Sequence, residues 1–175
     1  MNRPSRRAFT LVELLVVIAV IAILAGLAYP AYERSVGGAR ATACLSNLRQ
    51  LGAGLNAYLS DNNMMMPTLQ LGRDSINQDV PVIDNTIDKY VTDKRVFACP
   101  ADNKNYATTT GTSYCWNVAL NGQPVANLRF LISTTASLIP ILGDKEGFHP
   151  YLQDKVNILY ADGHVTKDLK FTSDN

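Results

Sequence analysis

Net charge, cysteine and catalytic signature motifs are all scarce in this chain of 175 residues, a length typical of about one domain. The formal net charge is +1, which favours neither a nucleic-acid partner nor an acidic tail. From Asn62 to the end, ten Lys and Arg residues stand against twelve Asp and Glu residues, so no basic patch is visible. Binding to nucleic acid by counterion release needs such a patch, and we therefore expect no nucleic-acid partner.

Signature motifs of common enzymes are also missing. The sequence has no HExxH, no GxSxG and no paired CxxC pattern. Acidic residues and histidines do gather in the last third, and a hydrolase or transition-metal site could be drawn from them: Asp144, Glu146, His149, Asp162 and His164. Turn chemistry alone explains Asp162-Gly163, however, and an isolated histidine beside a turn is usually solvated or structural. We expect that this protein is not an enzyme.

Charge is nearly absent from the longest apolar stretch. Residues 9–29 form a run of 21 residues with a single charged side chain, Glu13. As a helix the run would reach about 31 Å, close to the hydrocarbon thickness of a bilayer. This length and the terminal position both disagree with a buried helix of a soluble core. Three upstream arginines, with no acid among them, predict a cytoplasmic N-terminus and an external remainder: Arg3, Arg6 and Arg7.

Two ordinary interpretations of this stretch remain open. A secretory signal peptide would be cut after Ala28, at the small-x-small site Gly26-Leu27-Ala28, but its apolar core would be unusually long and would contain Glu13. An uncleaved membrane anchor has the same difficulty with Glu13. A carboxylate at the centre of a membrane helix costs about 2.5–3.5 kcal/mol. Near the helix start the macrodipole and snorkelling lower that cost, but they give the residue no purpose.

Glu13 acquires a purpose if the chain is cut before Phe9. The new α-amino group would be a cation at the same depth as the carboxylate. In an assembly of staggered parallel helices, Glu13 of one subunit could then pair with the Phe9 amine of the next. The two buried charges would satisfy each other and fix the register of the assembly.

The segment from Arg6 to Glu13, RRAFTLVE, resembles the processing site of type IV pilins and type II secretion pseudopilins. The resemblance implies that the prepilin peptidase cuts between Ala8 and Phe9, that Phe9 becomes N-methylated, and that Glu13 guides docking of subunits. The family normally has Gly where this chain has Ala8, so we expect slower cleavage. Pro30, with Gly26 upstream, also matches the family, whose helix can loosen there inside a filament.

Beyond the apolar stretch the pattern predicts an amphipathic continuation of the helix over residues 30–62. Its apolar face, which we expect to pack on the globular part, consists of Cys44, Leu48, Leu51, Leu55 and Leu59. Residues 82–91 are predicted as a short helix and residues 101–111 as a loop. Strands are predicted at 96–99, 112–118, 138–142, 156–160 and 164–170, with a two-residue hairpin turn at Asp162-Gly163.

The predicted fold class is therefore α+β, with a long N-terminal helix packed on a small, mainly antiparallel β-sheet head. The resemblance implies the pilin fold. It also implies four parts: a leader (1–8), a transmembrane or filament-core helix (9–29), its amphipathic continuation (30–62) and a β-rich head outside the cytoplasm (63–175).

Further motifs resemble a subgroup of pilin-like proteins that is abundant in planctomycetes and their relatives. This subgroup has a cysteine followed by Asn-Leu-Arg/Lys-Gln, then Tyr-x-x-Asp-Asn, then Cys-Pro, and it closes with His-x9-Asp-Gly. The chain has Cys44 with 47-NLRQ-50, 58-YLSDN-62, Cys99-Pro100 and Asp162-Gly163. Twelve residues, rather than nine, separate His149 from Asp162, and this departure puts a role for His149 in doubt.

The three cysteines allow one disulfide and one remaining thiol if the head lies outside the cytoplasm. Cys99–Cys115 would close a short loop at little entropic cost, and three buried thiols are a third option. The resemblance implies Cys44–Cys99, which would join the helix to the sheet. Secretion pseudopilins often bind calcium near the C-terminus, and Asp144 with Asp162 would offer suitable oxygen ligands, although the spacing matches no calcium motif. No other cofactor is expected.

These observations together predict a structural pilin-like subunit. It would be anchored by a single span in the bacterial inner membrane, processed by the prepilin peptidase and polymerised with other pilin or pseudopilin subunits. Secretion pseudopilus, type IV pilus and DNA-uptake filament are not separated by the sequence. The alternative from another class is a membrane-anchored or secreted binding domain that never polymerises.

Overall fold

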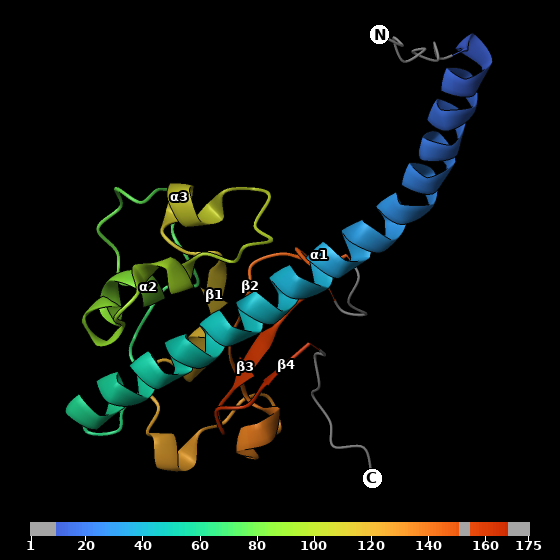
Figure 1. The fold of residues 1–175 in the computed structure, drawn as a ribbon. Coiled ribbons are helices and arrows are strands. Elements are labelled where there is room, and N and C mark those ends of the chain that lie inside the picture. The colour runs from blue at the N-terminus through green and yellow to red at the C-terminus, as the bar shows by residue number, and fades with distance from the viewer. Residues whose placement is uncertain (1–9, 151–154, 168–175) are drawn as a thin grey trace, which may run out of the picture. The chain divides into compact units, whose positions relative to one another are not determined.

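The computed structural model describes residues 10–150 and 155–167, so Ala8, Phe9 and the second half of the predicted last strand lie outside the described residues. The chain divides into two compact units, Met1–Val36 and Gly37–Asn175, which we call the anchor unit and the head unit. One helix, α1 (Leu11–Asp61), contributes to both units (Figure 1).

The head unit contains the part of α1 that carries the predicted leucine face. Cys44, Leu48 and Leu51 have no exposed surface, and Leu55 and Leu59 expose 2 % or less. Their spacing of three and four residues puts them on one side of the helix, and that side faces the core. The predicted apolar face is confirmed.

Four short strands form a single antiparallel sheet in the order β1-β2-β3-β4: β1 (Tyr114–Trp116), β2 (Pro140–Asp144), β3 (Ile158–Tyr160) and β4 (Val165–Thr166). In the register of the sheet, Cys115 lies opposite Gly143, and Gly143 lies opposite Ile158. The long helix and the small sheet make an α+β arrangement of the pilin-like kind, as the sequence predicts.

The hairpin between β3 and β4 is confirmed, but its loop has three residues rather than two. The pairs Ile158–Thr166 and Leu159–Val165 set the register, and the amide of Tyr160 donates to the carbonyl of His164. Residues 161–163 are left as the loop. Gly163 adopts φ +88°, the left-handed conformation that closes a type I turn with a bulge, and glycine adopts it without a steric penalty.

The segments between α1 and β2 contain short helices that the sequence pattern only partly predicted. The helix expected over 82–91 is present as α2 (Ile83–Thr86) followed by the 3-10 turn η1 (Asp88–Tyr90). The strand predicted at 96–99 is wrong, because η2 (Lys94–Phe97) occupies it, and the loop predicted at 101–111 contains α3 (Tyr106–Thr110). The remaining 3-10 turns are η3 (Val118–Leu120), η4 (Val125–Asn127) and η5 (Ala136–Leu138).

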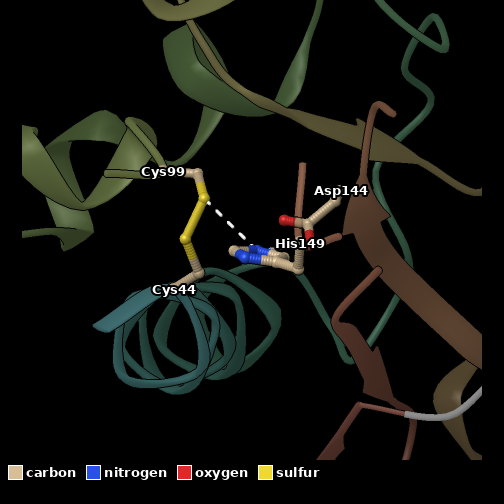
Figure 2. Close-up of side chains that lie close together, drawn as sticks. All are labelled: Cys44, Cys99, Asp144 and His149. Carbon is tan, nitrogen blue, oxygen red and sulfur yellow. Dashed lines mark hydrogen bonds and ion pairs between the residues drawn. A yellow bond between two sulfur atoms is a disulfide. The ribbon is translucent and has the colours of Figure 1, made fainter. Parts of the chain in front are cut away.

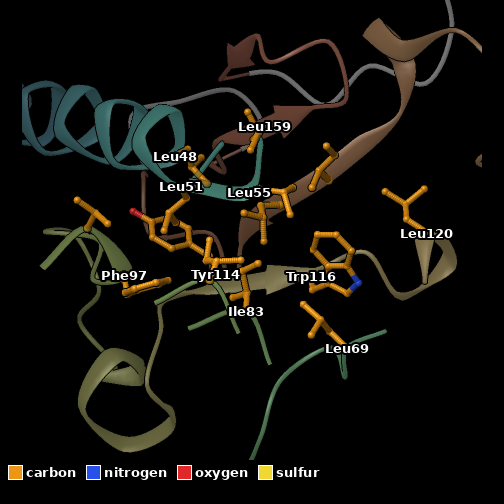
Figure 3. Packing of buried hydrophobic residues seen from close by; sticks show 14 of the residues in the cluster. Leu48, Leu51, Leu55, Leu69, Ile83, Phe97, Tyr114, Trp116, Leu120 and Leu159 are labelled. Carbon is orange, nitrogen blue, oxygen red and sulfur yellow. The ribbon is translucent and has the colours of Figure 1, made fainter. Parts of the chain in front are cut away.

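The core of the head unit lies between α1 and β1. Figure 3 shows Leu48, Leu51 and Leu55 pointing from the helix toward Tyr114 and Trp116 of β1. Both aromatic side chains are at most 1 % exposed. This packing fixes the position of Cys44 on α1 relative to the segments that follow η2 and β2.

Candidate functional site

The first turn of α1 is closed by a reciprocal hydrogen-bond pair between Thr10 and Glu13. The Glu13 carboxylate accepts from the Thr10 amide and from the Thr10 hydroxyl, both at 2.8 Å, and the Glu13 amide donates to Thr10 Oγ1 at 3.2 Å. This is a capping box, which satisfies backbone donors that a helix start leaves unpaired. The sequence signal Thr-x-x-Glu was available for it, and our sequence reasoning missed it.

The apolar residues of α1 in the anchor unit are exposed all round the helix. Each of the following side chains exposes at least 45 % of its surface: Leu11, Val12, Leu14, Leu15, Val16, Val17, Ile18, Val20, Ile21, Ile23, Leu24 and Leu27. Among the described residues α1 is the one helix that is long and apolar enough to cross a membrane. A helix that is hydrophobic on every side needs lipid or other apolar helices around it.

Pro30 lies inside α1 and is the only proline of that helix. Proline has no amide hydrogen, so the carbonyl four residues earlier, that of Gly26, loses its helical donor. Open space surrounds Gly26, where an added Cβ would meet nothing within 4 Å. Glycine and proline both weaken a helix, and loosening of α1 between these two residues stays a prediction.

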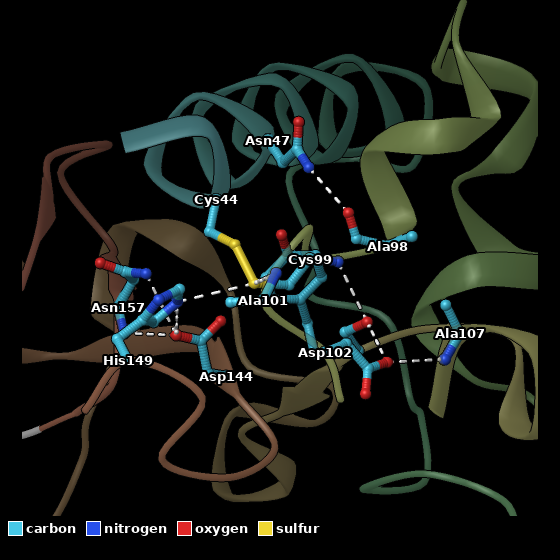
Figure 4. Close-up of a disulfide and its surroundings, with 12 residues drawn as sticks. Cys44, Asn47, Ala98, Cys99, Ala101, Asp102, Ala107, Asp144, His149 and Asn157 are labelled. Carbon is cyan, nitrogen blue, oxygen red and sulfur yellow. Dashed lines mark hydrogen bonds and ion pairs between the residues drawn. A yellow bond between two sulfur atoms is a disulfide. The ribbon is translucent and has the colours of Figure 1, made fainter. Parts of the chain in front are cut away.

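A disulfide joins Cys44 of α1 to Cys99, two residues after η2, and their Cα atoms are 5.1 Å apart. It is the pairing that the resemblance implied, and it bridges a sequence separation of 55 residues. Beside it, the Asn47 side chain donates to the carbonyl of Ala98 at 2.9 Å, which ties the same turn of α1 to the same segment (Figure 4). This hydrogen bond and the disulfide together attach the helix to the segment that follows η2.

The Cys99 segment is held on its other side by Asp102. The Asp102 carboxylate accepts from the Ser113 hydroxyl at 2.7 Å and from the amide of Ala107 at 3.1 Å, while Ser113 Oγ accepts from the Cys99 amide at 3.0 Å (Figure 4). Partial burial raises the pKa of Asp102, but these hydrogen bonds outweigh burial and hold the pKa below its ordinary value.

His149 and Asp144 lie directly against the disulfide. His149 Nε2 is 3.5 Å from Cys99 Sγ and 3.2 Å from Asp144 Oδ2 (Figure 2). The side chains of His149 and Asp144 are 2 % and 0 % exposed. Asp144 ends β2, and His149 follows five residues later in the segment after that strand. We call Cys44, Cys99, Asp144 and His149 the cysteine centre.

Polar atoms of the cysteine centre are only partly satisfied. Asp144 Oδ2 accepts from the Asn157 amide at 2.6 Å and from the Asn157 side chain at 3.2 Å. His149 Nδ1 and Asp144 Oδ1 are buried and have no hydrogen-bond partner among the described residues. One ligand atom from each member of the centre lies within 4.8 Å of every other, and within the described part of the chain this is the one such cluster.

Asp144 and Asp162, the pair expected to bind calcium, belong to different clusters. Asp162 lies in the β3–β4 loop, where its Oδ1 accepts from the His164 amide at 3.1 Å and contacts His164 Nδ1 at 2.5 Å. Buried Asp144 is held instead by Asn157 and His149. Calcium binding by the two aspartates stays a prediction, and the geometry gives it no shared site.

Cys115 is the free cysteine. It lies in β1 and its sulfur contacts the carbonyl of Gly143 at 3.5 Å. Burial raises the pKa of the Cys115 thiol, which disfavours the reactive thiolate. The pairing of Cys99 with Cys115 that we left open is therefore not the one in the structure.

Comparison with known proteins finds one match. Residues 3–29 match the family model of the prokaryotic N-terminal methylation motif. No curated protein and no solved structure matches the chain. The matched range holds the upstream arginines, Ala8, Phe9 and Glu13, and the described part of it is the exposed, apolar beginning of α1.

Proposed function

We propose that this chain, whose N-terminus is a prepilin segment of the type IV pilin and pseudopilin kind, is a structural subunit of a filament. The prepilin peptidase removes residues 1–8 by cutting between Ala8 and Phe9, and Phe9 is then N-methylated. The processed helix holds the subunit in the inner membrane, with the head outside the cytoplasm, until the helix joins the filament core. The protein itself performs no catalysis in this scheme.

The observation that carries this proposal is the apolar surface of α1 around a single carboxylate. From Leu11 to Leu27 the helix exposes apolar side chains in every direction. Lipid suits such a surface before assembly, and neighbouring helices of the same kind suit it afterwards. An anchor needs only the first of these, and in an anchor Glu13 would serve only the capping box with Thr10.

Glu13 has two partners in succession in this proposal. In the single chain its carboxylate is held by Thr10 in the capping box. In the filament, it turns to the methylated ammonium group of Phe9 on the neighbouring subunit. Glu13 thus exchanges the neutral Thr10 for the charged ammonium group of Phe9. In an apolar surrounding the carboxylate and the ammonium group attract each other strongly, and either charge alone would be costly.

Substituting Glu13 separates docking from capping. Glutamine at this position still closes a capping box, because its side chain accepts from the same amide, but it carries no charge. In Glu13→Gln the ammonium of the neighbour is left unpaired, which costs about 3 kcal/mol or more per subunit. Incorporation of the variant into sheared filaments should fall at least about tenfold, while the amount in the membrane stays unchanged.

Two matched variants complete this experiment. Thr10→Val removes the hydroxyl of the capping box and keeps the carboxylate, so it should assemble better than Glu13→Gln. Glu33→Gln removes a carboxylate on the same helix, beyond the apolar run, and should assemble like the natural chain. Equal assembly of Glu13→Gln and the natural chain would refute the charge pairing, and absence of the natural chain from any filament would favour the non-polymerising anchored domain.

The surface presented by the filament belongs to the head, whichever filament it is. A secretion pseudopilus, a type IV pilus and a DNA-uptake filament share the processed helix and differ in what the head contacts. The subgroup suggested by the Cys-Pro and Asp-Gly motifs also stays a prediction.

A further inference from the structure

The cysteine centre contains more polar chemistry than a disulfide requires. A disulfide is complete without hydrogen-bond partners, yet His149 and Asp144 are buried against this one. Burying a carboxylate and an imidazole is unfavourable unless their polar atoms have partners. Here His149 Nε2 faces both Asp144 Oδ2 and the sulfur of Cys99, and one donor atom from each of the four residues lies within 4.8 Å of every other. This cluster of donors indicates a second state of the centre, in which the four side chains share a ligand.

We propose that, when its disulfide is reduced, the head unit binds one Zn²⁺ ion through Cys44, Cys99, Asp144 and His149. The disulfide and the zinc site are alternative states of the same four side chains. This inference concerns the head unit and stands independently of whether the chain forms filaments.

The donor set selects the metal. Two thiolates, an imidazole nitrogen and a carboxylate oxygen are the ligands that zinc takes in four-coordinate protein sites. Calcium takes six to eight oxygen ligands, and this centre offers too few of them. The ligands come from α1, the segment after η2, the end of β2 and the segment after β2, so a bound ion would join four parts of the head unit.

Two of the distances between donor atoms already match the edges of a tetrahedral zinc site. With Zn–S about 2.3 Å and Zn–N or Zn–O about 2.05 Å, a tetrahedron has an S–N edge of about 3.6 Å and an N–O edge of about 3.3 Å. Cys99 Sγ lies 3.5 Å from His149 Nε2, and Nε2 lies 3.2 Å from Asp144 Oδ2. Opening the disulfide until its sulfur atoms are about 3.8 Å apart would supply a third edge, between the two thiolates.

Asn157 provides the outer support that metal ligands commonly have. Its amide and side chain both donate to Asp144 Oδ2, so the carboxylate is oriented before any ion arrives (Figure 4). All four ligand residues are buried. A buried site of this kind binds an ion without competition from bulk water for its ligands.

The change between the two states is a balanced exchange. A small dithiol, or a thioredoxin-like protein dithiol, passes two electrons and two protons to Cys44 and Cys99 and becomes a disulfide itself. Zn²⁺ then displaces the two thiol protons to solvent as it binds the thiolates. In the reverse direction, a disulfide oxidant accepts two electrons from the thiolates and two protons from solvent and becomes a dithiol, while the Cys44–Cys99 bond forms and Zn²⁺ leaves.

The test uses the full chain in detergent, either oxidised or reduced with a phosphine that is afterwards removed under nitrogen. Each sample receives zinc chloride and then gel filtration, and bound zinc is measured by elemental analysis. We expect one zinc per reduced chain and none per oxidised chain. Cobalt chloride should give the reduced chain the visible bands of tetrahedral Co²⁺ and a near-ultraviolet thiolate-to-metal band.

Variants identify the ligands. His149→Gln and Asp144→Asn should each weaken zinc binding at least about tenfold and alter the cobalt spectrum. Cys115→Ser removes the free thiol, and His164→Gln alters a histidine–aspartate pair on the exposed hairpin, so both should bind zinc like the natural chain. Zinc retained by His149→Gln and Asp144→Asn at natural affinity would overturn the proposal.

Loss of structure on reduction does not obscure the result. If the reduced chain unfolds, added zinc should restore the near-ultraviolet circular dichroism of the head unit together with the cobalt spectrum, because the ion replaces the covalent link. A reduced chain that neither binds zinc stoichiometrically nor refolds with it would overturn the proposal as well.

Discussion

Removing the Cys44–Cys99 disulfide should destabilise the head unit more than any conservative change of one residue in it. The bond closes a loop with a sequence separation of 55 residues. In the chain-entropy treatment, a loop of that length restricts the unfolded chain by about 4 kcal/mol at 25 °C. The double variant Cys44→Ala/Cys99→Ala should therefore lose about 4 kcal/mol of unfolding free energy, and a typical measured loss is about 2–4 kcal/mol.

Trp116 makes this loss measurable. It is the only tryptophan of the chain and is 1 % exposed in the core beneath α1, so its fluorescence reports unfolding of the head unit. Urea unfolding of the full chain in detergent gives the midpoint and the slope for each variant. The control is Cys115→Ala, which removes the free thiol and should change the unfolding free energy by less than about 1 kcal/mol.

Two results would refute this reasoning. In the double variant, a loss of unfolding free energy below about 1 kcal/mol, with an unchanged dependence on urea concentration, would be one such result. It would mean that α1 stays packed in the head unit without the covalent link. A loss as large in Cys115→Ala as in the double variant would mean that removal of a thiol side chain, rather than of the link, is responsible.

Other predictions concern the helix packing and the acid behaviour of the head unit. Gly54→Ala should destabilise by about 1–3 kcal/mol, because its Cβ would lie 2.7 Å from Val91 Cγ2. Gly38→Ala, where a Cβ meets nothing within 4 Å, should instead stabilise by about 1 kcal/mol in the same urea assay. Since the pKa of Asp102 is below its ordinary value of 3.8 in the folded chain, its contribution to stability is present above that value and is lost as the pH falls through the folded pKa. Asp102→Asn should flatten the fall in urea midpoint between neutral and acid pH, and an unchanged slope against pH would contradict this assignment.

Periodicity predicted the parts of the fold in which one face of an element is buried. The leucine spacing on α1 identified the buried face correctly. Residues three and four positions apart lie on the same side of a helix, and that side faces the core. Strands β1 and β3 lie within predicted stretches, whereas β2 (Pro140–Asp144) overlaps the predicted stretch 138–142 and ends two residues later. The prediction at 96–99 was wrong because Val96 and Phe97 are buried in a 3-10 turn, whose start is capped by the Asp93 side chain accepting from the Arg95 amide.

The cysteine centre shows what sequence reasoning could not reach. Asp144 and His149 were noticed in the last third of the chain, but the spacing of His149 departs from the subgroup motif and put a role for this histidine in doubt. No local pattern places it against a disulfide whose cysteines lie 50 and 105 positions earlier. That contact arises because the disulfide brings Cys44 of α1 and Cys99 together beside the segment that follows β2. The capping box at Thr10, in contrast, was visible in the sequence and needed no structure.

The central claim is that the chain is processed as a prepilin, and the N-terminus of the protein from its native membranes tests it most directly. Intact mass and sequencing of the terminal peptide would identify the first residue and its modification. The account predicts a chain that begins at N-methylated Phe9. A chain that begins at Tyr29 would contradict the account, because a signal peptidase would then have released a soluble domain and Glu13 would have been discarded. A chain that retains residues 1–8 would contradict it as well, since no ammonium group would exist at Phe9 for Glu13 to pair with.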